Sequence, residues 1–433
     1  MQSFVKSNYS KIKGHKHYAK AVQWTKLLSI TGGAQLIVQL TGLLTGVFLT
    51  RFLPTREYAL YTIANAMLAT MTVLSDGGIS SGVMALGGKV WKDKVMLGKV
   101  LATGFSLRKQ FAVFSLLITL PILGYLLARQ DAKWWEIAII IVTLIPAFFA
   151  ALSDSLLQVV PKLHQNLKPL QKNQVVVNVL RLGLSISSVF FFPFTAVALL
   201  ANGIPRIFGN FELKKIASGF IEPATETDPA MRKEILAVVK RILPGSIYFC
   251  ISGQISVWLI SLFGSTDSVA SIGALGRFSM LLSLFTLMFG MLLIPRFARL
   301  EENKGKLLKF FVSVTFMVTA ISVGVIGFFY LFSEQFLWIL GDQYKGLDKE
   351  LVLTITASCL SMMSGLFFGL SSSRGKPTSP WLIIVGNILF VILGCVLFNI
   401  KELEGILYFN IFINTYPIAI HIFNFYYKIY YSK

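Results

Sequence analysis

The sequence is poor in charge, in acidic residues and in cysteine. Charged residues make up 14% of its 433 residues, against roughly a quarter in soluble domains, and Asp and Glu number 20 against 40 Lys and Arg. Cys250, Cys359 and Cys395 each lie inside an apolar run, so they predict neither a disulfide framework nor a metal site. Apolar and polar residues do not alternate with the period of a strand, which argues against a barrel.

Long apolar runs dominate what remains. Hydrophobic residues make up 55% of the chain. Stretches such as 27–50 and 310–332 reach the length of about 20 residues that a helix needs to cross a bilayer. We therefore predict an all-α polytopic membrane protein with about twelve spans. The expected spans are 27–50, 57–75, 110–128, 135–158, 174–192, 194–211, 243–263, 273–295, 310–332, 350–371, 379–399 and 405–427.

The basic residues are divided unevenly between the loops. With the amino terminus inside, 31 of the 40 Lys and Arg fall in inner segments and 7 in outer ones, while Arg181 and Arg277 lie deeper within spans. Because cytoplasmic loops are rich in Lys and Arg, we predict a bacterial inner-membrane protein with both termini in the cytoplasm. This asymmetry explains the net charge of +20 without nucleic acid. Alternating lysines and apolar residues over 86–107 predict a helix on the inner leaflet or, alternatively, a solvated linker.

A polar stretch near 212–230 divides the chain, and it ends in a Thr-Asp-Pro sequence typical of a helix cap and first turn. An even number of helices on each side predicts a parallel repeat, with two six-helix lobes around a central cavity. The predicted domains are a basic cytoplasmic tail (1–26), an N-terminal lobe (27–211), a cytoplasmic linker with an amphipathic helix (212–242) and a C-terminal lobe (243–433).

Four short motifs follow one another between residues 51 and 344. They are an Arg-x-Leu-Pro-x-x-x-Tyr turn at 51–58, an Asp-x-Gly helix end at 75–79, a proline followed by basic residues at 294–300 and a Leu-Gly-x-x-Tyr turn at 340–344. In this order they resemble the polysaccharide-flippase (Wzx-type) family of the multidrug/oligosaccharidyl-lipid/polysaccharide exporter (MOP) superfamily. The family pattern has phenylalanine where this chain has Leu340.

The resemblance implies a flippase and not an enzyme. Such a protein moves a lipid-diphosphate-linked oligosaccharide of the undecaprenyl diphosphate type from the inner to the outer leaflet by alternating access. The product serves a surface polysaccharide such as O-antigen, capsule or exopolysaccharide. The implied partners are that glycolipid, membrane lipid and, if transport is coupled, a proton or sodium ion; no cofactor and no nucleic acid are expected.

Charged residues inside spans are candidates for substrate binding, because burying a charge at the centre of a bilayer costs about 3 kcal/mol or more. Arg181 follows Lys172 by nine residues and so lies about 13 Å deeper, near mid-membrane. We predict that Arg181 binds the phosphates of the substrate. Alternatively, Asp154 lies at a similar depth and forms a structural ion pair with Arg181.

Arg51 and Arg277 are predicted near the outer interface, where they bind the diphosphate in the outward state or extend to the outer surface. Asp76 and Asp154 are candidates for coupling to an ion. For Asp76, at the inner end of the second span, capping of an interfacial turn is the alternative.

Three glutamines inside spans are candidates for binding sugar hydroxyls. Gln35 and Gln39 lie one turn apart in the first span, and Gln254 lies in the seventh. Equally, buried amides hold helices together in membranes, and we keep that interpretation open.

Other functions compete with the flippase. A multidrug or cation antiporter of the same superfamily would favour an acidic cavity. A membrane glycosyltransferase or polymerase would need catalytic residues on outer loops, and the longest predicted outer loop is 333–349. A channel would need a selectivity filter or a ring of charge, and no segment resembles one. A scaffold for cytoplasmic partners stays open.

Overall fold

The computed structural model describes residues 16–222, 227–298, 300–301, 303–374 and 379–430, and every regular element within these ranges is a helix. The first part of the chain forms α2 (Lys16–Phe52), α3 (Thr55–Asp76), α4 (Ile79–Val90), α5 (Lys94–Ala128), α6 (Trp134–Leu157), α7 (Val159–Leu163), α8 (Leu167–Phe191) and α9 (Thr195–Ser218). The second part forms α10 (Pro229–Phe263), α11 (Thr266–Ala298), α12 (Lys304–Leu331), α13 (Ser333–Leu340), η1 (Asp342–Tyr344), α14 (Asp348–Ser373), α15 (Pro380–Leu397) and α16 (Leu403–Tyr430). We call α2–α9 the N-lobe and α10–α16 the C-lobe. Residues 1–15 of the predicted basic tail and 223–226 of the predicted linker lie outside the described residues.

Eleven helices in the described ranges are long and apolar enough to cross a membrane, and the chain is a multi-pass membrane protein. The predicted span 194–211 corresponds to α9, which is 24 residues long but more polar. Its amide N–H groups donate inside the lobe: Asn202 Nδ2 to the Tyr61 hydroxyl (2.8 Å) and Asn210 Nδ2 to the Ala150 carbonyl (2.7 Å). A polar helix is tolerated here because its polar groups face other helices.

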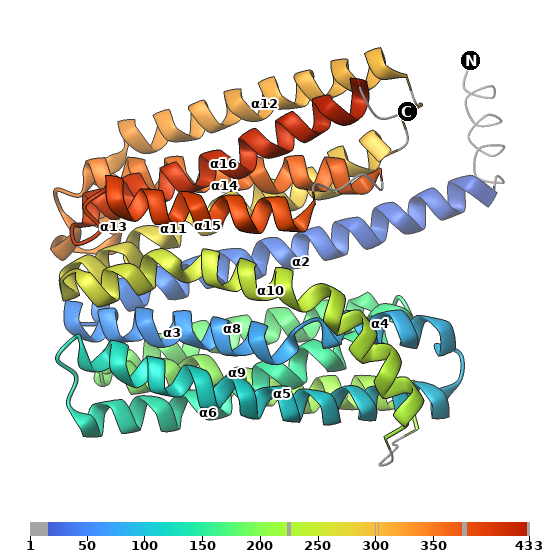
Figure 1. Ribbon diagram of the computed structural model, residues 1–433. Coiled ribbons are helices and arrows are strands. Elements are labelled where there is room, and N and C mark those ends of the chain that lie inside the picture. The colour runs from blue at the N-terminus through green and yellow to red at the C-terminus, as the bar shows by residue number, and fades with distance from the viewer. Residues whose placement is uncertain (1–15, 223–226, 299, 302, 375–378, 431–433) are drawn as a thin grey trace, which may run out of the picture.

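The two lobes share one packing pattern. In the N-lobe, α9 packs on α6 and α8, α8 on α2, and α3 on α6. In the C-lobe, α16 packs on α14 and α15, α15 on α10, and α11 on α14. The helices that pack on one another occupy the same places in the chain order of each lobe. This confirms two lobes built as a parallel repeat. Figure 1 shows them as two halves of one long bundle, with α2 beginning and α16 ending at the same end.

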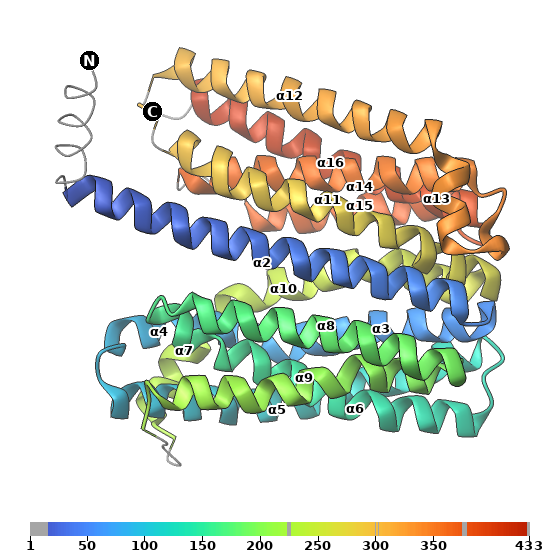
Figure 2. The same cartoon turned by 180° about the vertical axis from the view of Figure 1, so that it is seen from behind.

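Helices α2 and α10 occupy the layer between the halves, as both views show (Figures 1 and 2). Each is the first helix of its lobe, and each also contacts the other lobe: α2 packs on α11 and α13, and α10 packs on α3, α4 and α5. The Asp228 side chain caps α10 by accepting hydrogen bonds from the backbone N–H groups of Ala230 (2.7 Å) and Met231 (3.3 Å). From this cap α10 continues without a break through the predicted seventh span.

The predicted surface helix over 86–107 is wrong. Helix α4 ends at Val90, and a turn leads to Asp93, whose side chain caps α5. Residues 94–107 are therefore the first turns of the 35-residue helix α5. Of the apolar positions that suggested contact with lipid headgroups, Val100 and Leu101 are buried in a core that α10 completes with Ile235, whereas Trp91, Val95 and Met96 are exposed. The segment is amphipathic as predicted, but the buried part of its apolar face packs against α4 and α10.

Close packing of α10 on α4 depends on Gly82. A Cβ on Gly82 would lie 2.9 Å from Ile235 Cγ2 and 3.3 Å from the Ile235 Cα, whereas a Cβ on Gly88 of the same helix would lie 3.8 Å from Leu163 Cδ2. Gly82 thus brings the backbones of α4 and α10 together, as small residues do between membrane helices.

We expect Gly82→Ala to lower the melting temperature of the detergent-solubilised protein, because overpacking costs about 1–3 kcal/mol. Gly88→Ala is the matched control and should leave the melting temperature unchanged or raise it, since Ala is favoured over Gly in a helix by about 1 kcal/mol. Thermal unfolding followed by size-exclusion fluorescence measures both. Equal shifts for the two variants would contradict this packing.

Candidate functional site

The N-lobe contains a polar cavity of about 320 Å³ between α2, α6, α8 and α9, bordered by Met280 of α11. Its charged residues are two arginines and one aspartate. Most of its other polar residues are amides. The polar lining residues are Gln35, Gln39, Asp154, Gln158, Asn173, Gln174, Asn178, Arg181 and Arg206. The cavity is therefore a cationic site surrounded by hydrogen-bonding groups.

Arg181 lies on α8 and extends across the cavity toward α2. Its Nη2 is 3.4 Å from the position that a Cβ would take on Gly42, so the guanidinium lies against bare backbone. Its Nε is buried without a hydrogen-bond partner, and it forms no ion pair with any carboxylate of the described residues. Arg206 and Arg277 lie near enough to repel its charge. Arg181 thus holds its positive charge without an ion pair, in a cavity with two arginines and one aspartate.

Asp154 lines the same cavity but does not form the predicted ion pair with Arg181. Its carboxylate accepts a hydrogen bond from Gln158 Nε2 (3.0 Å). Asp154 and Arg206 also border a second cavity of about 510 Å³, whose wall includes Asn65, Asp76 and, from α10, Ser246. Asp154 and Arg206 thus lie in the wall that the two N-lobe cavities share.

Asp76 ends α3 and pairs with Arg108 of α5, a residue that the sequence analysis had placed in an inner loop. Arg108 is 2% exposed, and its guanidinium also donates to the Ser80 hydroxyl (2.7 Å) and the Ser155 hydroxyl (2.6 Å). Asp76 accepts from the Ser80 hydroxyl (2.6 Å) and backbone N–H (3.2 Å). This network ties together α3, α4, α5 and α6.

Arg277 of α11 lies at the contact between the lobes. Its Nε donates to the Tyr58 hydroxyl (2.9 Å), and its guanidinium lies 5.7 Å from the ring centroids of both Tyr58 and Tyr61. A Cβ on Gly46 would lie 2.6 Å from the Arg277 Cδ, so α2 needs glycine at this point. The contact joins α2 and α3 of the N-lobe to α11 of the C-lobe.

Arg51 is exposed at the end of α2, away from the cavities. Its guanidinium lies 5.1 Å from the Trp338 ring centroid, and its Nη1 donates to the Trp338 carbonyl at 3.4 Å. Next to it, Gln343 Nε2 donates to the Thr50 carbonyl (2.9 Å). Arg51 therefore belongs to the contact that joins the end of α2 to α13 and η1.

The three predicted glutamines lie in different surroundings. Gln35 Nε2 donates to Gln174 Oε1 (3.1 Å), linking α2 to α8, and Gln35 also lines the N-lobe cavity. Gln39 lines the same cavity, and no hydrogen bond is formed by its side chain within the described residues. Gln254 of α10 lines neither the N-lobe cavities nor the C-lobe cavity.

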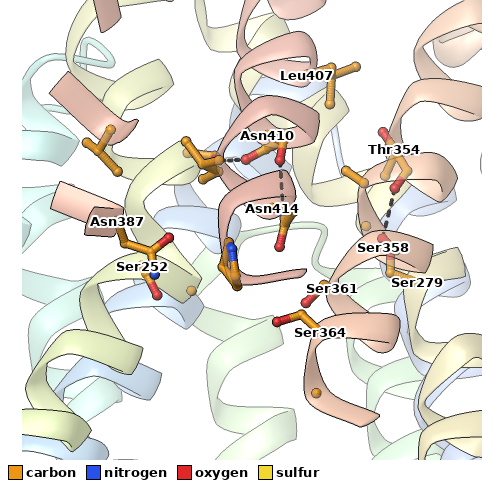
Figure 3. A pocket seen from close by; sticks show the side chains of 18 of the residues that line it. Ser252, Ser279, Thr354, Ser358, Ser361, Ser364, Asn387, Leu407, Asn410 and Asn414 are labelled. Atoms are coloured by element: carbon orange, nitrogen blue, oxygen red, sulfur yellow. Dashed lines mark hydrogen bonds between the residues drawn. The ribbon is translucent and has the colours of Figure 1, made fainter. Parts of the chain in front are cut away.

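The C-lobe contains a cavity of about 520 Å³ with no charged Asp, Glu, Lys or Arg in its lining. Figure 3 shows hydroxyl and amide side chains from α10, α11, α14, α15 and α16 gathered around it. These residues are Ser252, Ser256, Ser279, Thr354, Ser358, Ser361, Ser364, Asn387, Asn410 and Asn414. Tyr248, Phe368 and His421 complete the polar and aromatic lining.

An apolar groove of about 260 Å³ borders this cavity between α10 and α15. The two hollows share Tyr248, Ser252 and Val391 in their walls, so they lie side by side. The groove is otherwise lined by Ile and Pro, and its Ile388 and Ile392 are 49% and 58% exposed. The C-lobe cavity thus has an exposed apolar groove on the side of α10 and α15.

The sequence analysis missed Arg108 and the C-lobe cavity. Arg108 had a detectable signal: Leu101, Gly104, Ala112 and Ser115, which share its helical face, are all buried, whereas Lys109 is exposed. A charge on a small, apolar stripe indicates a buried partner. For the C-lobe the signal is weak, namely Ser252 and Ser256 on either side of Gln254, because Ser, Thr and Asn in a membrane helix serve packing and cavity lining equally.

Neither the family models nor the curated protein sequences gave a match to this chain. Solved structures do match. The lipid II flippase MurJ in an inward closed conformation aligns with a TM-score of 0.72 at 13% identity, over 91% of this chain and 86% of that one. An inward-facing multidrug resistance MATE family transporter of the MOP superfamily aligns with a TM-score of 0.69 at 16% identity, over 90% and 93%.

A third match is a MOP superfamily transporter from Pyrococcus furiosus, described as having a binding pocket of reverse polarity. It aligns with a TM-score of 0.60 at 13% identity, over 93% of this chain and 94% of that one. The fold is therefore that of MATE and MurJ, with two lobes of helices. An outward-facing MATE family transporter of the MOP superfamily aligns with a TM-score of 0.62 at 14% identity, over 94% of this chain and 95% of that one.

We expect Asp76→Asn to destabilise the protein by about 3 kcal/mol, because it leaves the Arg108 charge buried and unpaired. The double variant D76N/R108Q should recover most of this loss, since a neutral pair of similar size replaces the ion pair. A thermal double-mutant cycle in detergent measures the coupling. If the double variant is no more stable than Asp76→Asn, the pair does not act as a structural lock.

Proposed function

We propose that this protein is a flippase for a lipid-diphosphate-linked oligosaccharide, acting by alternating access in a bacterial inner membrane during assembly of a surface polysaccharide. The observation that carries the proposal is the unpaired Arg181 guanidinium in an amide-lined cavity of the N-lobe. Guanidinium groups bind phosphates in a bidentate manner, and an uncompensated one at membrane depth favours an anionic ligand.

Further positive charge supports a diphosphate rather than a single anionic group. Arg206 lines both N-lobe cavities, and Arg277 lies on the other side of Arg181 at the contact between the lobes. A diphosphate spreads its charge over several oxygens and so suits two or three neighbouring guanidinium groups. Arg51 forms part of the lobe contact at the end of α2, where it could meet the substrate only once the lobes separate there.

The orientation belongs to the same proposal. We place the end at which α2 begins and α16 ends in the cytoplasm, because most Lys and Arg of the chain lie there. The contacts of Arg51, Gln343 and Arg277 then close the outer side. The substrate would enter the N-lobe cavity from the inner leaflet.

Asp154 is our candidate for ion coupling. It is a carboxylate without an ion pair in the described part of the chain, and it lies where the two N-lobe cavities meet. A proton or sodium ion bound there would weaken its attraction for Arg206 and Arg181. Asp76 is a weaker candidate because Arg108 already neutralises it.

The competing function is a multidrug or cation antiporter, since MATE transporters share this fold. An exporter of cations would place carboxylates in its cavity without matching arginines, whereas here two arginines share the N-lobe cavity with one aspartate. This excess of positive charge supports the flippase.

Arg181→Ala should slow transport of the glycolipid by about 10- to 100-fold, the worth of a charge-assisted hydrogen bond to phosphate. Proteoliposomes holding an undecaprenyl diphosphate with a neutral galactose-containing disaccharide report transport through a membrane-impermeant galactose oxidase. The control is Arg129→Ala, which removes an exposed guanidinium that only covers Tyr125. Wild-type liposomes that expose no lipid but accumulate ethidium, with Asp154→Asn inactive, would favour the multidrug exporter instead.

A further inference from the structure

The C-lobe cavity is a second polar site inside the membrane region, and its chemistry is opposite to that of the N-lobe cavity. Its volume of about 520 Å³ falls within the range of roughly 300–1,000 Å³ that ligand sites occupy. Hydroxyl, amide and imidazole groups line it, and Asp, Glu, Lys and Arg are all missing from the lining. An ionic ligand would lose its hydration there without gaining a counterion, so the cavity favours a neutral ligand.

The polar groups of this cavity are not all used by the protein. Asn387 and Asn414 each donate to a backbone carbonyl one turn earlier, which leaves their amide groups at the cavity wall. Ser361 and Ser364 of α14 form no hydrogen bond within the described residues, and Figure 3 shows both extending from the helix toward the side of Asn414. These hydroxyls are free to bind a ligand that both donates and accepts hydrogen bonds.

Packing between helices does not explain these residues. Ser and Thr that hold membrane helices together lie where two helices meet closely. The Ser279 and Ser358 hydroxyls do so, 2.7 Å apart between α11 and α14. Ser361 and Ser364 instead face open space on the same helix α14.

We infer that the C-lobe cavity binds neutral sugar residues of a lipid-linked glycan. This inference rests on the proposed function and extends it: the diphosphate lies at Arg181 and the uncharged sugars lie in the C-lobe. Sugar hydroxyls match a lining of Ser, Thr and Asn, and the aromatic side chains of Tyr248 and Phe368 offer faces for sugar C–H groups. The exposed apolar groove along α10 and α15 lies beside the cavity, which favours a lipid-anchored glycan over a free sugar.

Binding to three lipids tests the inference in full-length protein held in nanodiscs. The lipids are undecaprenyl diphosphate alone, the same lipid with a disaccharide of N-acetylglucosamine and galactose, and the same lipid with glucuronic acid in place of galactose. Wild type should bind the neutral glycolipid more tightly than the bare diphosphate, and should bind the acidic glycolipid at least about tenfold more weakly than the neutral one.

The double variant S361A/S364A should bind the neutral glycolipid about 5- to 20-fold more weakly, with the affinity for bare undecaprenyl diphosphate unchanged. The control S313A/S371A removes two hydroxyls from α12 and α14 outside the cavity and should behave as wild type. Melting temperatures of both double variants show that they are folded.

The outcomes separate the two proposals. If S361A/S364A keeps the wild-type preference among the three lipids, the C-lobe does not bind the glycan, while the flippase proposal stands on its dependence on Arg181. If Arg181→Ala leaves the affinity for bare undecaprenyl diphosphate unchanged, the proposed diphosphate site is overturned. An acidic glycolipid bound as tightly as the neutral one would contradict the preference for uncharged sugars.

Discussion

A guanidinium buried among membrane helices stays charged, so it must meet either a fixed carboxylate or an anion that comes and goes. This fold contains both cases. Arg108 is 2% exposed, pairs with Asp76 and donates to the Ser80 and Ser155 hydroxyls, and it thereby joins α3, α4, α5 and α6. Arg181 is only partly buried at the N-lobe cavity, and it has no ion-pair or hydrogen-bond partner in the described residues. Arg108 therefore holds helices of the N-lobe together, whereas Arg181 carries a positive charge that a bound anion can neutralise.

The two lobes repeat one arrangement of helices but differ in what they enclose. The N-lobe cavity combines arginines with amides, whereas the C-lobe cavity contains hydroxyls and amides without any Asp, Glu, Lys or Arg. A charged, sugar-bearing lipid has the same division within a single molecule. A fold that began as two similar halves can therefore recognise an asymmetric substrate by exchanging side chains and not architecture.

Much of this architecture is readable from sequence, because apolar length and charge asymmetry are strong signals in a membrane chain. The predicted spans correspond to helices, and the Thr-Asp-Pro cap begins α10 where expected. Prediction from sequence was wrong or silent where the position of a residue depends on helices that are distant in the chain. The apolar face of 94–107 that contains Leu97 and Val100 packs on α4 and α10, and the ion pair of Arg108 and the cavity around Ser361 are formed with residues far along the chain.

Helix α10 packs against both lobes, and this determines which parts of the bundle can move together. It belongs to the C-lobe by sequence, yet Ile235 is buried against α4, Cys250 lies against the Thr70 carbonyl at 3.9 Å and the Ser261 carbonyl accepts from Gln130. On its other side it faces α15 across an apolar groove. Helix α10 is thus attached to the N-lobe along its length, and a movement of α10 together with the N-lobe would widen the groove between α10 and α15.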